Sequence, residues 1–204
     1  MAVKPILFNT EMVRAILDGR KDATRRIVKG FIPNDAVWGY TAFTPKGYIS
    51  CRGTFADGYG EKFFKLPCEP GNILYVRETW KKAPNGYYYY EDWQKNVIAD
   101  ITKWKPSIHM PKEAARIWLK VTDVKVERLQ NITEDGSKAE GAIDNRGFIH
   151  SPDNEYDRIH TAREHFIEIW NSTIKKSSLD RYGWDASPWV WVIEFERCEK
   201  PEVN

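Results

Sequence analysis

The sequence contains few cysteines and shows no pattern that would pair them. Cys51, Cys68 and Cys198 are an odd number, and none belongs to a Cys-x-x-Cys pair. This arrangement argues against a disulfide framework and against a zinc site. The chain also has no Gly-x-Ser-x-Gly nucleophile elbow and no Walker phosphate-binding loop. We therefore expect no bound metal and no cofactor. We also expect neither a serine nucleophile of the elbow type nor a Walker nucleotide-binding site.

Long apolar runs and a strong net charge are also missing. No run approaches the ~18 apolar residues that predict a membrane-spanning helix, and residues 1–4 lack the pattern of a signal peptide. With 31 Lys and Arg against 29 Asp and Glu, the formal net charge is +2, so no chain-wide basic field attracts nucleic acid. We expect a cytoplasmic protein without a membrane partner. Residues 1–30 carry seven bases against three acids, which is compatible with a local basic face.

Aromatic residues, by contrast, are abundant: nine Trp, ten Tyr and nine Phe. Such side chains build hydrophobic cores, and they also build platforms on which nucleic-acid bases stack. Packing in the core is the default interpretation for most of them. A composition of 42% hydrophobic and 29% charged residues is typical of a globular protein, and 204 residues fit a single domain of ordinary size.

The hydrophobic patterns predict an α+β fold. Asn85-Gly86 predicts a hairpin, and segments at about 30–65 and 81–111 look inserted. Five or six strands with three helices are too many strands for the long crossovers of a parallel sheet. We expect one domain over residues 1–204, a small, mostly antiparallel barrel with flanking helices. Strands are expected at about 4–8, 27–28, 47–51, 72–80, 114–128 and 188–195, and helices at about 10–18, 130–140 and 161–173.

The most unusual stretch is the run from Gly19 to Arg26, which contains Lys21 and Thr24 beside three arginines. A threonine hydroxyl becomes a nucleophile when a base takes its proton. A lysine can be that base if burial or neighbouring cations lower its pKa. A strand would place Thr24 and Arg26 on one face, and we expect the other two arginines to be solvated. The alternative interpretation is a solvated run of cations that stabilises the end of a helix.

Three residues of the second inserted region and its border are further candidates for lining a pocket: Trp80, Lys105 and His109. His109 lies in a loop that also carries lysine and tryptophan, and a structural role for it is equally open. The run Tyr87–Tyr90 could stack bases. A hairpin with half of these tyrosines packed inward is the preferred interpretation, because alternate residues of a strand face opposite sides.

Several segments resemble the motifs of the ASCH domain family, whose barrel fold is similar to that of PUA RNA-binding domains. The run from Gly19 to Arg26 resembles the family signature Gly-x-Lys-x-x-x-x-Arg. The segment from Leu129 to Gly141 resembles its Leu-x-x-(Ile/Leu)-(Thr/Ser)-Glu helix, and Trp189–Phe195 resembles its closing strand. Pro70–Leu74 resembles the entry of another family strand. The two inserted segments are not covered, and they look like those of longer ASCH proteins from phages and prophages.

This resemblance implies a function and a set of roles. Small bacterial acetylcytidine amidohydrolases of the family use a lysine, a threonine and a glutamate, which match Lys21 as proton acceptor, Thr24 as nucleophile and Glu140 as proton donor. Arg26 would bind a carbonyl or phosphate, and Trp80, Lys105 or His109 would line the pocket. The implied partner is a modified nucleoside or single-stranded nucleic acid, in a bacterial or phage-infected cytoplasm.

Two alternatives remain open beside this amidohydrolase prediction. The same cleft could belong to a noncatalytic module of a phage or prophage that binds RNA or DNA, or that reads a modified base. Alternatively, the chain could be a phage protein that acts on a host factor through its inserted loops. A likeness of fold cannot decide among these functions.

Overall fold

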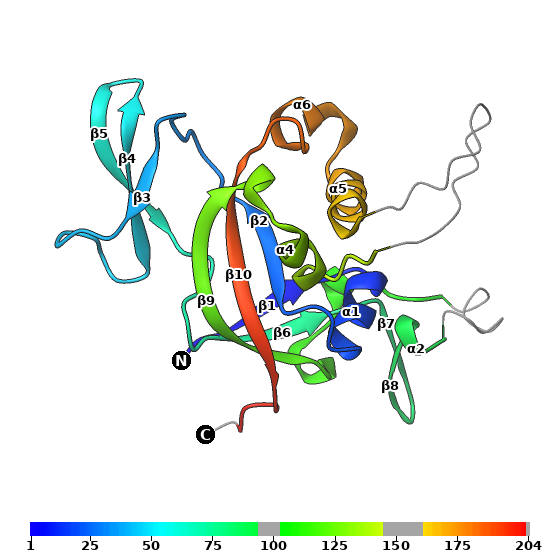
Figure 1. Cartoon of the computed structure of the whole chain (residues 1–204). Coiled ribbons are helices and arrows are strands. Elements are labelled where there is room, and N and C mark those ends of the chain that lie inside the picture. Colours follow the sequence, from blue (N-terminus) through cyan, green and yellow to red (C-terminus); the bar gives the residue numbers. More distant parts are fainter. Residues whose placement is uncertain (94–102, 145–160, 203–204) are drawn as a thin grey trace, which may run out of the picture.

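The computed structural model describes residues 1–93, 103–144 and 161–202. It has an α+β fold in which most paired strands run antiparallel, as the sequence predicts. The main sheet has five strands in the order β1-β6-β9-β10-β2 (Figure 1). β1 and β6 pair in parallel, whereas the other three pairs are antiparallel. The five strands are β1 (Val3–Leu7), β2 (Ala23–Ile27), β6 (Ile73–Arg77), β9 (Trp118–Arg128) and β10 (Trp189–Cys198).

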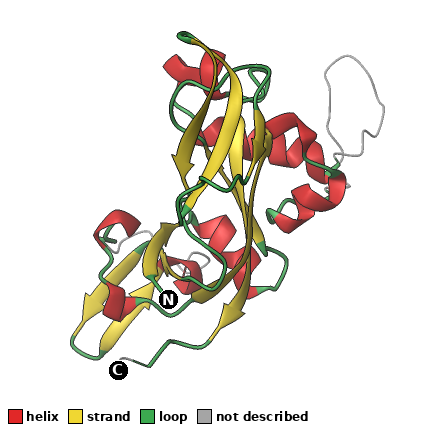
Figure 2. Ribbon diagram, turned by 90° about the vertical axis from the view of Figure 1, so that its left-hand side faces the viewer, coloured by secondary structure: helices red, strands yellow, loops and turns green. Residues whose placement is uncertain are grey.

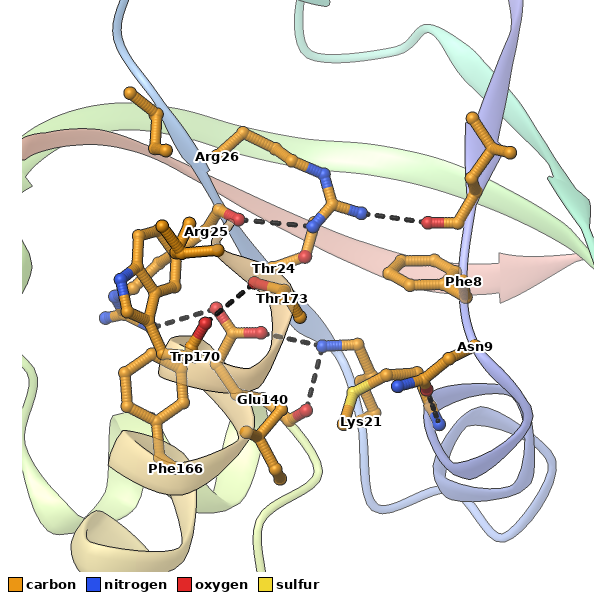
Figure 3. Close-up of a pocket in the computed structure, with 15 residues that line it drawn as sticks. Phe8, Asn9, Lys21, Thr24, Arg25, Arg26, Glu140, Phe166, Trp170 and Thr173 are labelled. Carbon is orange, nitrogen blue, oxygen red and sulfur yellow. Dashed lines mark hydrogen bonds and ion pairs between the residues drawn. The ribbon is translucent and has the colours of Figure 1, made fainter. Parts of the chain in front are cut away.

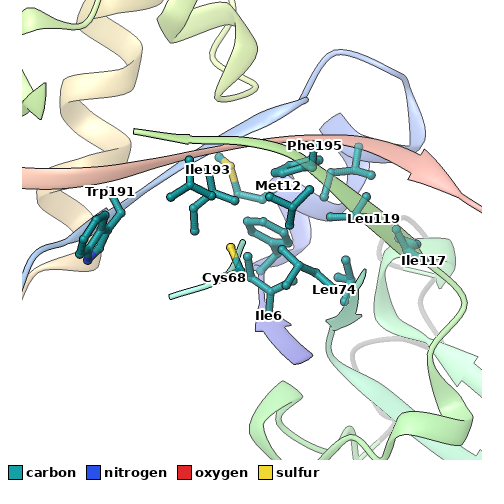
Figure 4. Packing of buried hydrophobic residues seen from close by; sticks show 14 of the residues in the cluster. Ile6, Met12, Cys68, Leu74, Ile117, Leu119, Trp191, Ile193 and Phe195 are labelled. Atoms are coloured by element: carbon teal, nitrogen blue, oxygen red, sulfur yellow. The ribbon is translucent and has the colours of Figure 1, made fainter. Parts of the chain in front are cut away.

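The main sheet is curved, and β9 bends visibly along its length (Figure 1). Its inner side holds the largest hydrophobic cluster, to which β1, β6, β9 and β10 all contribute (Figure 4). Among the described strands the sheet does not close into the expected barrel, because β1 and β2 form its two edges and are not paired with each other. A curved open sheet is therefore the architecture that the structure supports.

Strand β10 separates two hydrophobic clusters. Val190 and Val192 lie in a cluster with helix α5 (Ala162–Thr173), whereas Trp191 and Ile193 lie in the larger cluster inside the sheet (Figure 4). Successive side chains of a strand point to opposite faces, so an uninterrupted apolar run can supply both clusters at once. This explains why the first half of β10, Trp189–Ile193, is apolar at every position.

Three helices form where the sequence predicts them, and each has a side-chain cap. Asn9 accepts a hydrogen bond at the start of α1 (Thr10–Leu17), and Thr133 does so at the start of α4 (Glu134–Ala139). Thr161 and the third residue of α5 form a capping box. The helices lie around the sheets (Figure 2), and none in the described ranges is long and apolar enough to cross a membrane. Two shorter helices are α2 (Tyr90–Trp93) and α6 (Leu179–Tyr182).

The two segments expected as insertions form sheets of their own. Residues 37–65 form a three-stranded antiparallel sheet that stands away from the main sheet (Figure 1), and a hairpin turns at Asn85-Gly86 as predicted. The described part of the chain thus contains ten strands, and the prediction of five or six was too low. The added strands are β3 (Val37–Gly39), β4 (Tyr48–Phe55), β5 (Gly58–Lys65), β7 (Trp80–Ala83) and β8 (Gly86–Tyr89).

The run of four tyrosines alternates as expected for a strand. Tyr87 and Tyr89 pack against the hydrophobic cluster that contains Trp80. Tyr88 and Tyr90 instead make ring contacts with two other tryptophans, at centroid distances of 6.3 and 5.5 Å. The prediction that half of the tyrosines pack inward is therefore confirmed.

Candidate functional site

A cleft of about 220 Å³ lies at the free edge of β2, next to α1 and α5 (Figure 3). β2 is an edge strand because, among the described strands, it pairs with β10 alone. Apolar side chains from β1, α1 and α5 form part of the wall, and charged side chains from β2 and from the end of α4 form the rest. The cleft is lined by Leu7, Phe8, Asn9, Met12, Lys21, Thr24, Arg25, Arg26, Ile27, Glu140, Phe166, Ile169, Trp170, Thr173 and Ile174.

Local backbone structure brings Lys21 and Glu140 together across 119 residues of sequence. The two residues form an isolated antiparallel bridge, which joins the segment after α1 to the C-terminal end of α4. Gly141 allows this close approach: its φ is +93°, and a Cβ there would lie 2.8 Å from the Cβ of Ala15. Gly19, with φ +74°, ends α1 in the left-handed conformation that glycine favours. The positive φ at both positions therefore favours glycine over other residues.

The Lys21 ammonium has a protein acceptor for each of its three hydrogens. Nζ donates to the Glu140 carboxylate at 2.7 Å and to the Glu140 carbonyl at 2.8 Å (Figure 3). It also donates to the Ala23 carbonyl at 2.6 Å. The Lys21 side chain is fully buried. Burial lowers the pKa of Lys21 from its ordinary value, and the neighbouring Glu140 carboxylate partly opposes this effect. Lys21 thus has the lowered pKa that a lysine base requires, together with an acid next to it.

Arg25 contradicts the prediction that it is solvated. Its guanidinium is buried, donates twice to Glu127 at 2.7 and 3.0 Å, and reaches Glu140 at 3.4 Å. The Glu140 carboxylate therefore lies between two cations, Lys21 and Arg25. Burying a charge is costly unless it is paired, and these partners offset that cost for all four groups. Arg20, in contrast, is 39% exposed, as the sequence suggested.

Thr24 and Arg26 lie on the same face of β2, as strand alternation predicts. Thr24 is 1% exposed, and its hydroxyl has no hydrogen-bond partner among the described residues. Arg26 donates to the carbonyls of Arg25 and Leu7 at 3.2 and 3.0 Å. Its guanidinium and the Lys21 ammonium each lie 5.3 Å from the ring centroid of Phe8, so two cations contact one aromatic ring at the cleft.

The backbone of β2 also contributes to the cleft. The Val28 amide donates to the Trp189 carbonyl, and the Asp22 carbonyl accepts from the Phe195 amide; Trp189 and Phe195 both belong to β10. The even-numbered residues along β2 therefore direct their backbone groups toward β10. In an antiparallel ladder the odd-numbered residues then point outward. The carbonyls of Ala23 and Arg25 do so, and they accept from Lys21 and Arg26. The N–H of Arg25 is consequently directed to the free edge, where a ligand can accept from it.

Three of the predicted pocket residues lie elsewhere. Trp80 is 4% exposed and belongs to a separate hydrophobic cluster. Lys105 pairs with it through two backbone hydrogen bonds of 2.8 and 3.1 Å, and its Nζ lies 5.1 Å from the Trp80 ring centroid. His109 is exposed at the end of a 3-10 turn, Ser107–His109. None of the three lines the cleft, because the segment after β8 packs on β7 rather than on β2.

Several lining residues were missed by the sequence interpretation. Phe166, Trp170 and Thr173 of α5 face Glu140 and Thr24 across the cleft, and Phe8 and Asn9 close its other side (Figure 3). The spacing of Phe166 and Trp170, four residues apart on the best predicted helix, marks one helical face. That signal indicates a buried face, but it does not distinguish a core from the wall of a cleft.

Comparisons with known proteins do not assign this site. The chain matches no family model, no curated protein and no solved structure. Within the described ranges, no group of three or more His, Cys, Asp and Glu side chains is arranged to hold a metal ion. What can be said of the site therefore depends on its own geometry: a small, partly apolar cleft with a buried Lys21–Glu140 pair and the Thr24 hydroxyl at its edge strand.

Proposed function

We propose that this protein hydrolyses an amide bond of an acylated, or similarly modified, pyrimidine nucleoside or base bound in the cleft. The observation that carries the proposal is that Lys21 and Thr24 of the Gly19–Arg26 run and Glu140, 119 residues after Lys21, line one small cavity. They are a base, a hydroxyl and an acid, the three groups that nucleophilic acyl transfer needs. The resemblance of their motifs to the ASCH family supports the same assignment.

The Lys21–Glu140 pair accounts for both proton-transfer roles. A single proton that moves along their 2.7 Å hydrogen bond converts an ammonium and a carboxylate into a neutral amine and a carboxylic acid. Burial favours the neutral amine of Lys21, since it lowers the pKa of Lys21 by disfavouring its charge. The pair then holds an acceptor for the Thr24 proton and a donor for the leaving amine without any change in its total charge.

The reaction follows from these roles. The Lys21 amine takes the proton of the Thr24 hydroxyl, whose oxygen attacks the acyl carbon while Glu140 protonates the departing nitrogen. The amine leaves, and the acyl group forms an ester with Thr24. Glu140, now a carboxylate, deprotonates a water that attacks this ester, and Lys21 returns a proton to the Thr24 oxygen. The outward N–H of Arg25 is a donor for the carbonyl oxygen as negative charge develops on it.

The cleft favours a small planar ligand. Its volume of about 220 Å³ is below the roughly 300–1,000 Å³ that is usual for drug-sized ligands. Rings of Phe8, Phe166 and Trp170 lie along its wall, and Arg26 supplies a cation that can bind a carbonyl or a phosphate. One modified base or nucleoside suits this combination better than a longer segment.

A panel of N-acylated cytidines and cytosines tests the proposal, with release of the free amine followed by chromatography. We expect turnover by the unaltered protein and a loss of roughly 10³-fold or more in kcat for Thr24→Ala, as for other removed nucleophiles. Thr122→Ala, which alters an exposed strand threonine of β9, is the matched control and should retain full activity. The proposal fails if the unaltered protein is inert across the panel, or if Thr24→Ala is equally active.

One observation favours a second candidate function, a noncatalytic module that reads a modified base. All three hydrogens of the Lys21 ammonium are donated within the protein, which is the arrangement of a fixed structural cation. For this function we expect modified nucleosides to quench the tryptophan fluorescence of the unaltered protein and of Thr24→Ala at equal concentrations, because Trp170 lines the cleft. No nucleoside would be consumed. Turnover that depends on Thr24 would rule this candidate out.

A further inference from the structure

The three-stranded sheet β3-β4-β5 has one face that the rest of the protein covers and one that it leaves open. Residues directly opposite each other in an antiparallel pair place their side chains on the same face. Trp38, Cys51 and Lys62 are aligned across the three strands, and the next aligned pair on that face is Ile49 with Phe64. Trp38 contacts the rings of Phe64, Trp189 and Trp191 at centroid distances of 5.2–6.1 Å. This face therefore fixes the sheet to β10 of the main body.

The opposite face, which we call the outer face, carries the buried Ser50 together with Val37, Tyr48, Arg52, Thr54, Tyr59, Glu61, Phe63 and Lys65. Tyr59 is 75% exposed, Val37 54% and Phe63 38%. Arg52 and Lys65 are exposed among these rings, and Tyr48 is half-buried opposite Lys65. Large apolar side chains gathered on one exposed sheet face usually indicate a binding surface.

We propose that the outer face binds single-stranded nucleic acid by stacking bases on Tyr59, Phe63 and Tyr48. Tyr59 and Phe63 are four residues apart on β5, which corresponds to about 13 Å along a strand. A flexible strand of nucleic acid can lay successive bases on rings at such a spacing, since every base has a π-face. This site is distinct from the cleft at β2, and the proposal does not depend on any activity there.

The charges of the outer face favour nucleic acid over an apolar partner. Arg52 and Lys65 lie beside the rings, where they can contact phosphates. Against them stand Glu61, which lies opposite Arg52, and Asp35, which accepts from the Thr54 hydroxyl at the end of the same face, so the cations gather at the Tyr48–Lys65 end. A protein–protein interface would also tolerate the aromatic rings and Arg52, but it is depleted of lysine and glutamate, which this face carries at Lys65 and Glu61. Aromatic rings interspersed with cations are the combination found on proteins that bind single strands.

Fluorescence anisotropy with a labelled 12-nucleotide oligo(U) and the matching oligo(dT), at low salt, tests the proposal. We expect saturable binding, weakened at least tenfold by Tyr59→Ala combined with Phe63→Ala. Phe31→Ala removes an exposed ring beside the same sheet that contacts Phe55, a residue of the covered face, and should change the affinity less than twofold. Arg52→Gln combined with Lys65→Gln should reduce the slope of log K against log salt by up to about 0.7 for each phosphate that is no longer neutralised.

Three results would overturn the proposal. One is the absence of binding by the unaltered protein, and another is equal binding by the Tyr59/Phe63 double variant. The third is a dimer of the unaltered protein, seen by analytical ultracentrifugation, that this double variant dissociates, because the outer face would then bind a second copy. Thr24→Ala should bind the oligonucleotides as the unaltered protein does, so a failure here is distinguishable from a failure of the proposed hydrolysis. All substituted residues of the outer face are exposed, and circular dichroism verifies that the variants fold.

Discussion

Replacement of Glu140 by glutamine should destabilise the protein far more than the same change at an exposed ion pair. Glu140→Gln preserves the size of the side chain and an oxygen that can accept from Lys21. Among the described residues, however, it removes the only anion within hydrogen-bond distance of the fully buried Lys21 ammonium. Breaking a buried ion pair by removing one partner costs about 3–5 kcal/mol. The two carbonyl acceptors of Lys21 remain, so we expect a value near the lower limit, about 3 kcal/mol.

The matched control is Glu194→Gln. Glu194 pairs with Lys125 at the same N–O distance of 2.7 Å, but the two side chains are 41% and 50% exposed. Solvent screens such a pair, and its loss costs about 0–1 kcal/mol. In a chain of this length 1 kcal/mol corresponds to about 2–4 °C in melting temperature. Differential scanning calorimetry at pH 7 should thus show a decrease of roughly 6–12 °C for Glu140→Gln and at most about 4 °C for the control.

The pH dependence of this difference has a definite sign. The pKa of Lys21 is lowered in the folded state, and without Glu140 its main raising influence is gone, so the pKa falls further. Between the folded pKa and the ordinary value of 10.5, the unfolded chain binds more protons at this residue, and stability rises with pH. The loss of unfolding free energy caused by Glu140→Gln should therefore be smaller at pH 10 than at pH 7. Equal melting temperatures for the two variants at pH 7 would refute the view that Lys21 is a buried cation held by Glu140.

Further predictions concern other parts of the molecule. Gly141→Ala should lower the free energy of unfolding, measured in urea, by about 1–3 kcal/mol, because the φ of +93° and the 2.8 Å approach to Ala15 leave no room for a methyl group. Its control is Gly60→Ala, because nothing lies within 4 Å of a Cβ added at Gly60. Burial raises the pKa of Cys51 and Cys68 to about 11, so a disulfide reagent at pH 8 should titrate Cys198 first and all three thiols only after unfolding. Two or three fast thiols in the native protein would contradict this.

The sequence predicts the parts of the site that depend on local rules. Strand alternation suffices to place Thr24 and Arg26 on one face, and the cap at Thr133 with its short helix places Glu140 at a helix end. The meeting of Lys21 with Glu140 follows from no spacing rule, because 119 residues separate them. It was predicted only through the resemblance of two motifs to one family. Its physical cause, the tight bridge at Gly141, becomes visible in three dimensions.

Other features also depend on contacts between residues far apart in the sequence, and the sequence therefore did not predict them. The sequence predicted that Arg25 is a solvated cation, because its partner Glu127 lies 102 residues away on β9. Trp80, Lys105 and His109 have side chains suited to a pocket, but their position is decided by the pairing of β7 with its neighbours. The glycine-rich segment 37–65 is held against β10 by Trp38, whose ring contacts Trp189 and Trp191 more than 150 residues later in the sequence.

The pairing of β2 with β10 has a consequence for synthesis of the protein on the ribosome. Thr24 lies opposite Ile193 of β10, 169 residues later in the sequence. At about 5–20 residues per second, roughly 8–34 s separate the synthesis of these two positions. During this interval Lys21 and its neighbours form a cationic, hydrated segment without their strand partner. The cleft can therefore assemble only after β10 has been synthesised, and a chain terminated before β10 would contain the Gly19–Arg26 run without the site that it helps to form.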